Sequence, residues 1–267
     1  FPTSQRWHRY VSASLRRKAL HLRKSPAVEK LAGFVPMYYM TGEWQLADPA
    51  RPYDSKTDDL RMAGFGPVAR ESFQNWASHK YGSVNRINQA WDTQYRSLQD
   101  ITVPSTSQRK KGRFGNMRDP QHQRKEIDFS IFLSTAMTYA INRVAGQLQT
   151  SLPGEQLVGA FYGHVLEHAW TPAGVQQQGH LALQQMLKSP RIDFYGSPYS
   201  YNNDNRFVGQ PLDTISILDS ASLHGKLAFM EEDTYTFAAS APGIKFAPGY
   251  HQRTRDLEET ITLLGRN

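Results

Sequence analysis

The chain contains no cysteine among its 267 residues. This absence excludes disulfide bonds, zinc sites built from thiolates and cysteine nucleophiles, and it leaves both an exported and a cytosolic location open. The sequence also has no apolar run as long as a membrane-spanning helix requires. We therefore expect no membrane span.

Three short motifs are absent as well. Neither G-x-G-x-x-G nor G-x-x-x-x-G-K-[ST] occurs, so the sequence does not favour a doubly wound sheet that binds a nucleotide. No G-x-S-x-G turn presents a serine nucleophile, which argues against a serine hydrolase. Internal repeats and low-complexity tracts are also absent.

The charge balance is basic, with a net charge of +7. The basic residues gather at 16–18, 23–24 and 109–111, and such short runs are typical of solvated faces. We therefore expect no nucleic-acid partner, whereas a sulfated or uronic polysaccharide stays compatible with the charge. A hydrophobic content of 39% is enough for one barrel-sized domain or two small ones.

Two apolar segments each end in a glutamate. The segment Gly33–Trp44 is predicted to be a strand that carries Glu43 at its carboxyl end, and Lys226–Glu231 repeats the pattern with Glu231. Parallel (β/α) barrels place their catalytic groups at the carboxyl ends of strands, and glycosidases use a pair of carboxyl groups. The pattern therefore predicts a glycoside hydrolase.

Helical and strand patterns alternate along the rest of the chain. Apolar residues at helical spacing predict a helix over 11–22 and a long helix from Phe129 to Leu148. Further helices are expected over 68–81, 84–91 and 175–187, strands over 156–162 and 192–198, and loops over 47–59 and 105–118. Four strands alternating with helices imply parallel βα units, although four are too few to close a barrel.

The carboxyl pair suits a retaining mechanism, in which one group acts as acid and the other attacks the sugar. Apolar neighbours would raise the pKa of the group that must be an acid. At the second site Glu231, Glu232 and Asp233 are adjacent. Side chains alternate along a strand, so only one of the two glutamates can face the pocket.

A second group of candidates follows the strand expected at 156–162. Glu167 lies between His164 and His168, which permits a metal site, but the segment reads as a strand end and loop, and a sugar-binding acid is the favoured interpretation. No metal is expected. Aromatic rings beside strand ends can stack on sugars. These candidates are Trp44, Tyr53, Tyr162, Trp170, Tyr199 and Tyr201. Trp76, Tyr81 and Trp91 lie at helical spacing and are expected in the core.

Several stretches resemble a known family. Trp76–Trp91, which continues to Tyr95 and Ile101–Pro104, resembles the segment W…KYG…LN…AWGT…Y…I..P that follows the acid/base strand in glycoside hydrolase family 42 β-galactosidases. Shorter stretches are similar to related bacterial clan A glycosidases. They are Phe161–His164, Gly179–Leu183 with Ser189-Pro190, Asp193-Phe194 with Ser197–Tyr201, and Leu223–Leu227 with Glu231–Thr234.

The resemblance implies a TIM (β/α)8 barrel with its acid/base after strand 4 and its nucleophile after strand 7. Glu43 then matches the acid/base and Glu231 the nucleophile. Gly42 stands where the clan usually has an asparagine that binds the sugar 2-hydroxyl, which leaves the sugar open. The match also implies one catalytic domain over 1–267 that covers strands 4 to 7 only and is incomplete at both ends. A homo-oligomer or a completing chain segment stays open as a partner.

The sequence therefore predicts a retaining, β-galactosidase-like glycoside hydrolase that needs no cofactor and acts on an oligo- or polysaccharide. Two alternatives remain. The first is a hydrolase of an anionic, sulfated galactan, which arginine or lysine residues lining the cleft would favour. The second is an inactive carbohydrate-binding barrel, in which Glu43 and Glu231 would lie too far apart or point away from the cleft.

Overall fold

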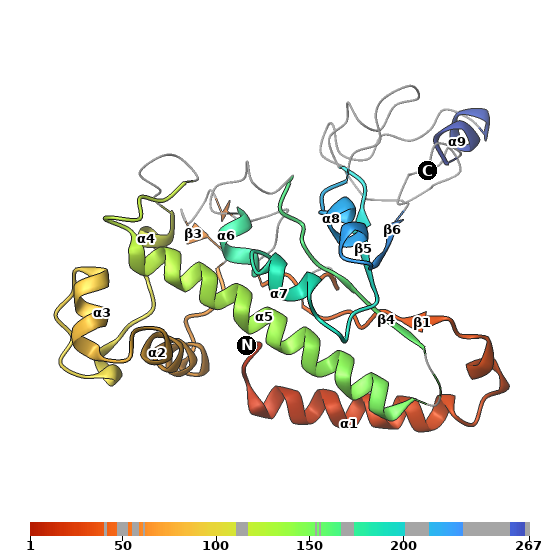
Figure 1. Cartoon of the computed structure of the whole chain (residues 1–267), viewed down its shortest axis with the longest axis horizontal. Coiled ribbons are helices and arrows are strands. Elements are labelled where there is room, and N and C mark those ends of the chain that lie inside the picture. Colours follow the sequence, from red (N-terminus) through yellow and green to blue (C-terminus); the bar gives the residue numbers. More distant parts are fainter. Residues whose placement is uncertain are drawn as a thin grey trace.

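The structure of the protein is a computed structural model, whose ribbon is shown in Figure 1. It describes residues 1–39, 42–46, 53–54, 59–60, 62–110, 117–152, 154, 156–166, 174–200, 214–231 and 257–264. Helices and strands alternate over most of these residues, as the sequence predicts. None of the described helices is long and apolar enough to cross a membrane.

The described strands form one parallel sheet and one small antiparallel pair. The parallel sheet contains, in spatial order, β1 (Gly33–Phe34), β4 (Leu157–Phe161), β5 (Phe194–Pro198) and β6 (Leu227–Glu231). The antiparallel pair is β2 (Tyr53–Asp54) with β3 (Asp59–Leu60). Because the order in the parallel sheet is also the order along the chain, each strand is followed by helix and then by its neighbour, as in a (β/α)8 barrel.

The helices are α1 (Gln5–Leu22), α2 (Pro67–Tyr81), α3 (Val84–Trp91), α4 (Thr106–Lys110), α5 (Arg124–Ser151), α6 (Gly174–Gln178), α7 (Leu183–Leu187), α8 (Leu218–Leu223) and α9 (Leu257–Leu264), with 3₁₀ turns η1 (Pro26–Lys30) and η2 (Leu98–Asp100). The helices predicted from apolar spacing are confirmed in α1, α2, α3 and α5. Helix α1 begins where the Ser4 hydroxyl accepts a hydrogen bond from the Trp7 amide at 3.2 Å. Its predicted apolar stripe faces inward, since Val11, Leu15 and Ala19 are buried.

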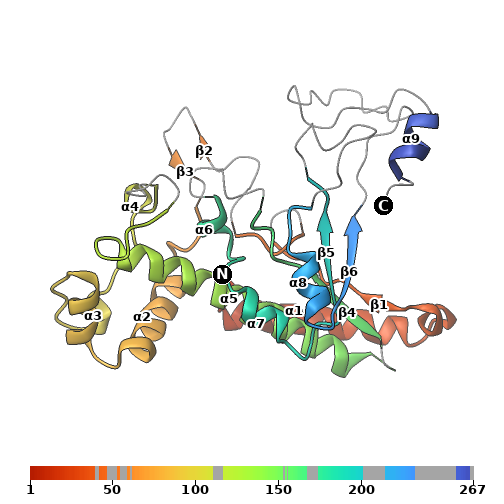
Figure 2. The ribbon, with the colours of Figure 1, turned by 45° about the horizontal axis from the view of Figure 1, so that its top comes forward.

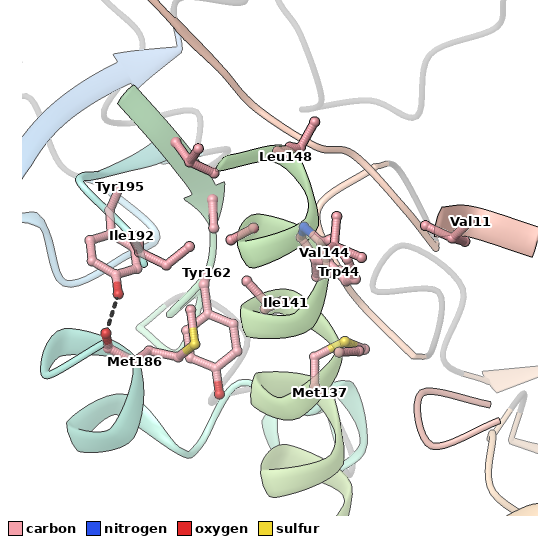
Figure 3. Packing of buried hydrophobic residues seen from close by; sticks show 14 of the residues in the cluster. Val11, Trp44, Met137, Ile141, Val144, Leu148, Tyr162, Met186, Ile192 and Tyr195 are labelled. Carbon is pink, nitrogen blue, oxygen red and sulfur yellow. Dashed lines mark hydrogen bonds between the residues drawn. The ribbon is translucent and has the colours of Figure 1, made fainter. Parts of the chain in front are cut away.

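The main core lies between the sheet and the helices α1 and α5 (Figures 1 and 3). Helix α5 directs Ile141 and Val144 toward Tyr195 of β5 on one side and toward Val11 of α1 on the other. The Tyr195 hydroxyl donates to the Met186 carbonyl oxygen at 2.6 Å, which ties β5 to α7. Burial raises the pKa of Tyr195, because the interior disfavours the phenolate.

A second core joins α2 and α3 to the first turns of α5, and at its centre is the buried carboxylate of Asp128. Lys80 Nζ lies 2.5 Å from Asp128 Oδ1, Trp91 Nε1 donates to Oδ2 at 2.9 Å, and the Tyr81 hydroxyl also donates to Oδ2. Arg124 Nε is 3.3 Å from Oδ1. Lys80, Tyr81 and Trp91, all from the 76–91 segment, therefore contact one carboxylate. Trp91 and Tyr81 pack in this core, as predicted.

The first predicted strand is much shorter than expected. The sequence predicts a strand within Gly33–Trp44 that carries Glu43 at its carboxyl end, but β1 ends at Phe34. Tyr39 has φ 65° and Gly42 has φ 84°, a left-handed conformation that cannot continue a strand. The Trp44 amide donates to the Tyr38 carbonyl oxygen at 3.0 Å, so the chain turns back before it reaches the position of Gln45.

Two further predictions are corrected. The stretch 105–118 is not wholly an exposed loop, because it contains α4, and Arg109 on this helix is 1% exposed. Arg109 Nε donates to Gln177 Oε1 at 2.7 Å, and burial, with a smaller contribution from Arg118, lowers the pKa of Arg109 to about 9. The helix predicted over 175–187 is divided into α6 and α7, between which Gly179 has φ 90°.

Candidate active site

Glu231 is the last residue of β6, so its prediction as a carboxylate at a strand end is confirmed. It pairs in register with Pro198 at the end of β5, and its side chain is partly buried. Side chains alternate along a strand, so Glu231 shares a face with Phe229, two residues earlier. The Phe229 ring contacts that of Phe161 on β4 with the ring centroids 5.7 Å apart. Glu231 is therefore on the sheet face that carries Phe161, opposite the face covered by α5.

The strand register, which sets the position of Glu231 along the sheet, depends on glycines paired with phenylalanines. Gly159 of β4 pairs with Phe194 of β5, and Gly196 of β5 pairs with Phe229 of β6. A Cβ on Gly159 would lie 2.0 Å from Phe194 Cε2, and one on Gly196 would lie 2.6 Å from Phe229 Cζ. Each ring thus occupies the space that a side chain on the neighbouring strand would need.

Glu43 is held differently from Glu231. It lies in the turn that follows β1, between Gly42 and Trp44, both of which have positive φ values of 84° and 61°. The expectation that a long strand carries Glu43 directly at its end is therefore wrong. Gly42 stands where the resembling clan usually has asparagine, and its φ favours glycine.

Trp44 fixes this turn to the protein interior. Its side chain is 0% exposed, and Nε1 donates to the Pro36 carbonyl oxygen at 2.8 Å. Its ring packs against those of Trp7 and Tyr38, with centroid separations of 6.5 Å and 5.2 Å, and lies beside α5 (Figure 3). Trp44 was expected to stack on a sugar, but in the structure it is a core residue that anchors the segment carrying Glu43.

Gln45, which no sequence pattern singles out, links Glu43 to the end of β4. Its Nε2 donates to Glu43 Oε2 at 2.9 Å and lies 3.4 Å from His164 Nδ1. Gln45 is 1% exposed and His164 is 0% exposed, so both are removed from solvent. His164 in turn lies against Phe161, with ring centroids 6.4 Å apart. Gln45, His164, Phe161 and Phe229 therefore form a line of neighbouring side chains that extends from Glu43 across the sheet to β6, the strand that carries Glu231.

Behind His164, a group of hydrogen bonds fixes the chain after β4. The His164 amide donates to His180 Nδ1 at 3.2 Å, and the Tyr162 hydroxyl donates to the Gly179 carbonyl oxygen at 3.0 Å while accepting from the Ala182 amide at 3.1 Å. Burial raises the pKa of Tyr162, and the bond from Ala182 acts weakly in the opposite direction. Tyr162 is 1% exposed and so supports His164 and His180 from the core, instead of offering a ring face to a sugar as expected.

The remaining residues predicted to contact the substrate are either buried or lie where the structure does not describe their side chains. Tyr199 follows β5 and is 1% exposed, with a bridge to Thr214, so its ring is also buried. Tyr53 lies in β2, where the backbone alone is described. Other predicted residues lie outside the described part of the chain. They are Glu167, His168, Trp170, Tyr201, Glu232 and Asp233. Among the described residues, no group of three or more His, Asp or Glu is arranged to hold a metal ion.

Comparison with known proteins connects this geometry with carbohydrate-active enzymes. The sequence model of glycoside hydrolase family 42, described as β-galactosidase, matches residues 58–192. The catalytic domain of β-amylase from Paenibacillus polymyxa is similar in structure, with a TM-score of 0.59 and 13% sequence identity over 86% of this chain and 63% of that chain. A search of curated protein sequences gives no significant match.

A β-galactosidase from Bacillus circulans sp. alkalophilus is similar over 90% of this chain and 35% of its own, with a TM-score of 0.52 and 13% identity. The chain thus spans less than two thirds of either protein. At these identities the likeness concerns the fold, and it confirms the predicted fold class: the described sheet corresponds to four strands of a (β/α)8 barrel.

Proposed function

Because the chain belongs to glycoside hydrolase family 42, the β-galactosidase family, we propose that it takes part in retaining hydrolysis of a β-galactoside, with Glu43 as acid/base and Glu231 as nucleophile. The observation that carries this proposal is the placement of the two glutamates. Glu43 lies in the turn after β1 and Glu231 is the last residue of β6 in the same parallel sheet, and a line of side chains, Gln45, His164, Phe161 and Phe229, extends from Glu43 to β6. Carboxyl ends of barrel strands are where such enzymes carry out their chemistry.

In the first step, the Glu43 carboxyl group gives a proton to the glycosidic oxygen while a Glu231 oxygen bonds to the anomeric carbon. The bond between that carbon and the leaving oxygen breaks. In the second step, Glu43, now ionised, takes a proton from water, the water oxygen bonds to the anomeric carbon, and the bond to Glu231 breaks. Two inversions give overall retention, and neither step requires a cofactor.

Gln45 supports the role of Glu43. Its Nε2 donates to Glu43 Oε2 at 2.9 Å, which fixes the plane of the carboxyl group, and its own position is fixed by burial. An acid that must place one proton within reach of a glycosidic oxygen gains from such restraint, because small displacements of a catalytic group lower the rate markedly.

The substrate proposal is a neutral galactoside. No Lys or Arg occurs in the described segments 43–46, 162–166, 197–200 and 229–231 at and beyond the strand ends. An anionic galactan in the cleft would need such cations, so these segments do not favour that alternative. The inactive carbohydrate-binding alternative is separated by the experiments below.

The nucleophile is tested with Glu231→Gln, assayed on an aryl β-galactoside. We expect loss of the burst of aryl alcohol that accompanies formation of the glycosyl-enzyme, because the amide keeps the side chain's shape but cannot attack. Glu71→Gln, an exposed change on α2, is the matched control and should keep full activity. Undiminished turnover in Glu231→Gln would assign the role to Glu232.

The acid/base is tested with Glu43→Ala. We expect hydrolysis of substrates with poor leaving groups to fall by about 10²–10⁴-fold, while an activated aryl galactoside still forms the glycosyl-enzyme. Added azide should restore turnover and give a β-galactosyl azide, since an anion attacks without a general base. Equal loss on both substrates without azide rescue would remove Glu43 from this role. If no galactoside is turned over by the unaltered protein, the inactive alternative is favoured.

A further inference from the structure

A groove of about 660 Å³ lies between α1 and α5, outside the sheet. These two helices run side by side in Figures 1 and 2. Arg9 and Arg16 of α1, Arg143 of α5 and Arg191, which precedes β5, line the groove. Helix α1 precedes β1 and α5 precedes β4, so the carboxyl ends of these helices lie toward the amino ends of the strands. Arg16 is in the second half of α1, so the groove extends toward the amino ends of the strands. It is therefore separate from the strand ends that carry Glu43 and Glu231.

The charge of this groove is of one sign. Helix α1 contains no Asp or Glu, and α5 contains none after Asp128. In the described part of the chain, no carboxylate forms an ion pair with any of the four arginines. Four guanidinium groups around one concave surface repel each other, and an anion bound among them would relieve this repulsion.

Neutral groups hold two of these arginines in position. Arg143 Nη1 donates to Gln5 Oε1 at 3.1 Å and to the Tyr139 hydroxyl at 2.6 Å. Arg191 lies directly over Gly146 of α5, where an added Cβ would be 2.6 Å from Arg191 Nη1. Glycine at this position thus lets the Arg191 guanidinium approach the helix. The Arg143 and Arg191 guanidinium groups are therefore held by neutral groups, which leave their positive charge uncompensated.

We propose that this groove is a second binding site, for sulfated segments of a polysaccharide. Guanidinium groups bind sulfate through paired hydrogen bonds, as they bind phosphate. The rest of the lining suits sugar hydroxyls, since it includes Asn142, Thr150 and the 43%-exposed Tyr139. A single-stranded nucleic acid would need several stacking rings, but Tyr139 is the one aromatic residue of the lining. The choice of a glycan among polyanions rests on the proposed carbohydrate function.

The test compares two doubly substituted proteins that lose the same charge from α1. Arg9→Gln/Arg16→Gln removes groove arginines, whereas Arg17→Gln/Lys18→Gln removes exposed charges that do not line the groove. Binding of a size-fractionated sulfated galactan is measured by titration calorimetry at low salt. Its desulfated form and a single-stranded DNA of equal charge are the comparison ligands. Circular dichroism establishes that both proteins keep the helix content of the unaltered protein.

We expect Arg9→Gln/Arg16→Gln to weaken sulfated-galactan binding by about 10-fold or more, because it removes two charge-assisted contacts. Arg17→Gln/Lys18→Gln should weaken it by less than about 2-fold, since exposed charges outside the groove act through screened, long-range fields. The desulfated polymer should bind far more weakly. Equal losses in the two proteins, equal binding of the desulfated form, or tighter binding of the DNA would each overturn the proposal.

The outcome is distinguishable from that of the proposed catalytic function. Hydrolysis of a small neutral aryl galactoside should be the same in Arg9→Gln/Arg16→Gln as in the unaltered protein, because the groove is remote from Glu43 and Glu231. A protein without hydrolase activity that still binds the sulfated polymer through Arg9 and Arg16 would end the catalytic proposal and support the groove. Hydrolase activity in a protein whose binding of the sulfated polymer does not depend on Arg9 and Arg16 would support the catalytic proposal and overturn the groove proposal.

Discussion

Replacing Asp128 tests how the second core is held together. In Asp128→Ala, the Trp91 indole N–H loses its acceptor inside a side chain that is 7% exposed, which costs about 1–3 kcal/mol for a buried donor left without a partner. The Lys80 side chain is 28% exposed and that of Arg124 is 38% exposed, so both regain water and lose less. Added to the lost bond from Tyr81, the expected decrease in the free energy of unfolding is about 3–5 kcal/mol.

The measurement is urea unfolding followed by tryptophan fluorescence, with the midpoint and slope compared between proteins. Asp128→Asn keeps the shape and one acceptor, so we expect it to lose about half as much as Asp128→Ala. Glu71→Ala on the exposed side of α2 is the control and should change the free energy of unfolding by no more than about 0.5 kcal/mol. A loss below about 1 kcal/mol in Asp128→Ala would show that water replaces the carboxylate, and the reasoning would be refuted.

Three further outcomes are expected. Gln45→Leu should lower kcat about 10-fold on poor leaving groups and change KM less, because it removes the restraint on Glu43; a loss confined to KM would contradict this. Gly159→Ala should destabilise the protein by about 1–3 kcal/mol through a clash with Phe194, and Phe194→Ala should relieve that clash in a double-mutant cycle. Burial raises the pKa of Tyr195 above its usual value near 10, so stability should hold below pH 10 and fall above it, as the unfolded tyrosine ionises first. A urea midpoint unchanged between pH 8 and pH 10.5 would count against the last point.

The sequence predicted best what local chemistry decides. The apolar spacing over 11–22 is contained in a few neighbouring residues, and the structure confirms a helix there, although α1 begins earlier, at Gln5. The apolar run that ends at Glu231 was also sufficient for β6. By contrast, the strand expected over Gly33–Trp44 ends at Phe34, and beyond it Tyr39 adopts a positive φ that composition alone does not reveal.

The candidate site was predictable only in part, because its supports join distant positions. Gln45 meets His164 across 119 positions in the sequence, a contact that no local pattern can indicate. The aromatic residues Trp44 and Tyr162 follow predicted strands, and such rings look the same in sequence whether they line a cleft or fill a core.

The pairing of glycines with phenylalanines limits how neighbouring strands of the sheet can align. One step of strand register moves a residue by about 3.3 Å along the strand and turns its side chain to the opposite face. If β6 slipped by one residue against β5, Phe229 would lose its place over Gly196, and Glu231 would leave the inner face altogether. The phenylalanine rings therefore permit one alignment of the strands, and that alignment sets the position of the Glu231 carboxylate along the sheet. Exchanging a strand of this sheet for one from a relative would succeed only if the glycine opposite each ring were carried over with it.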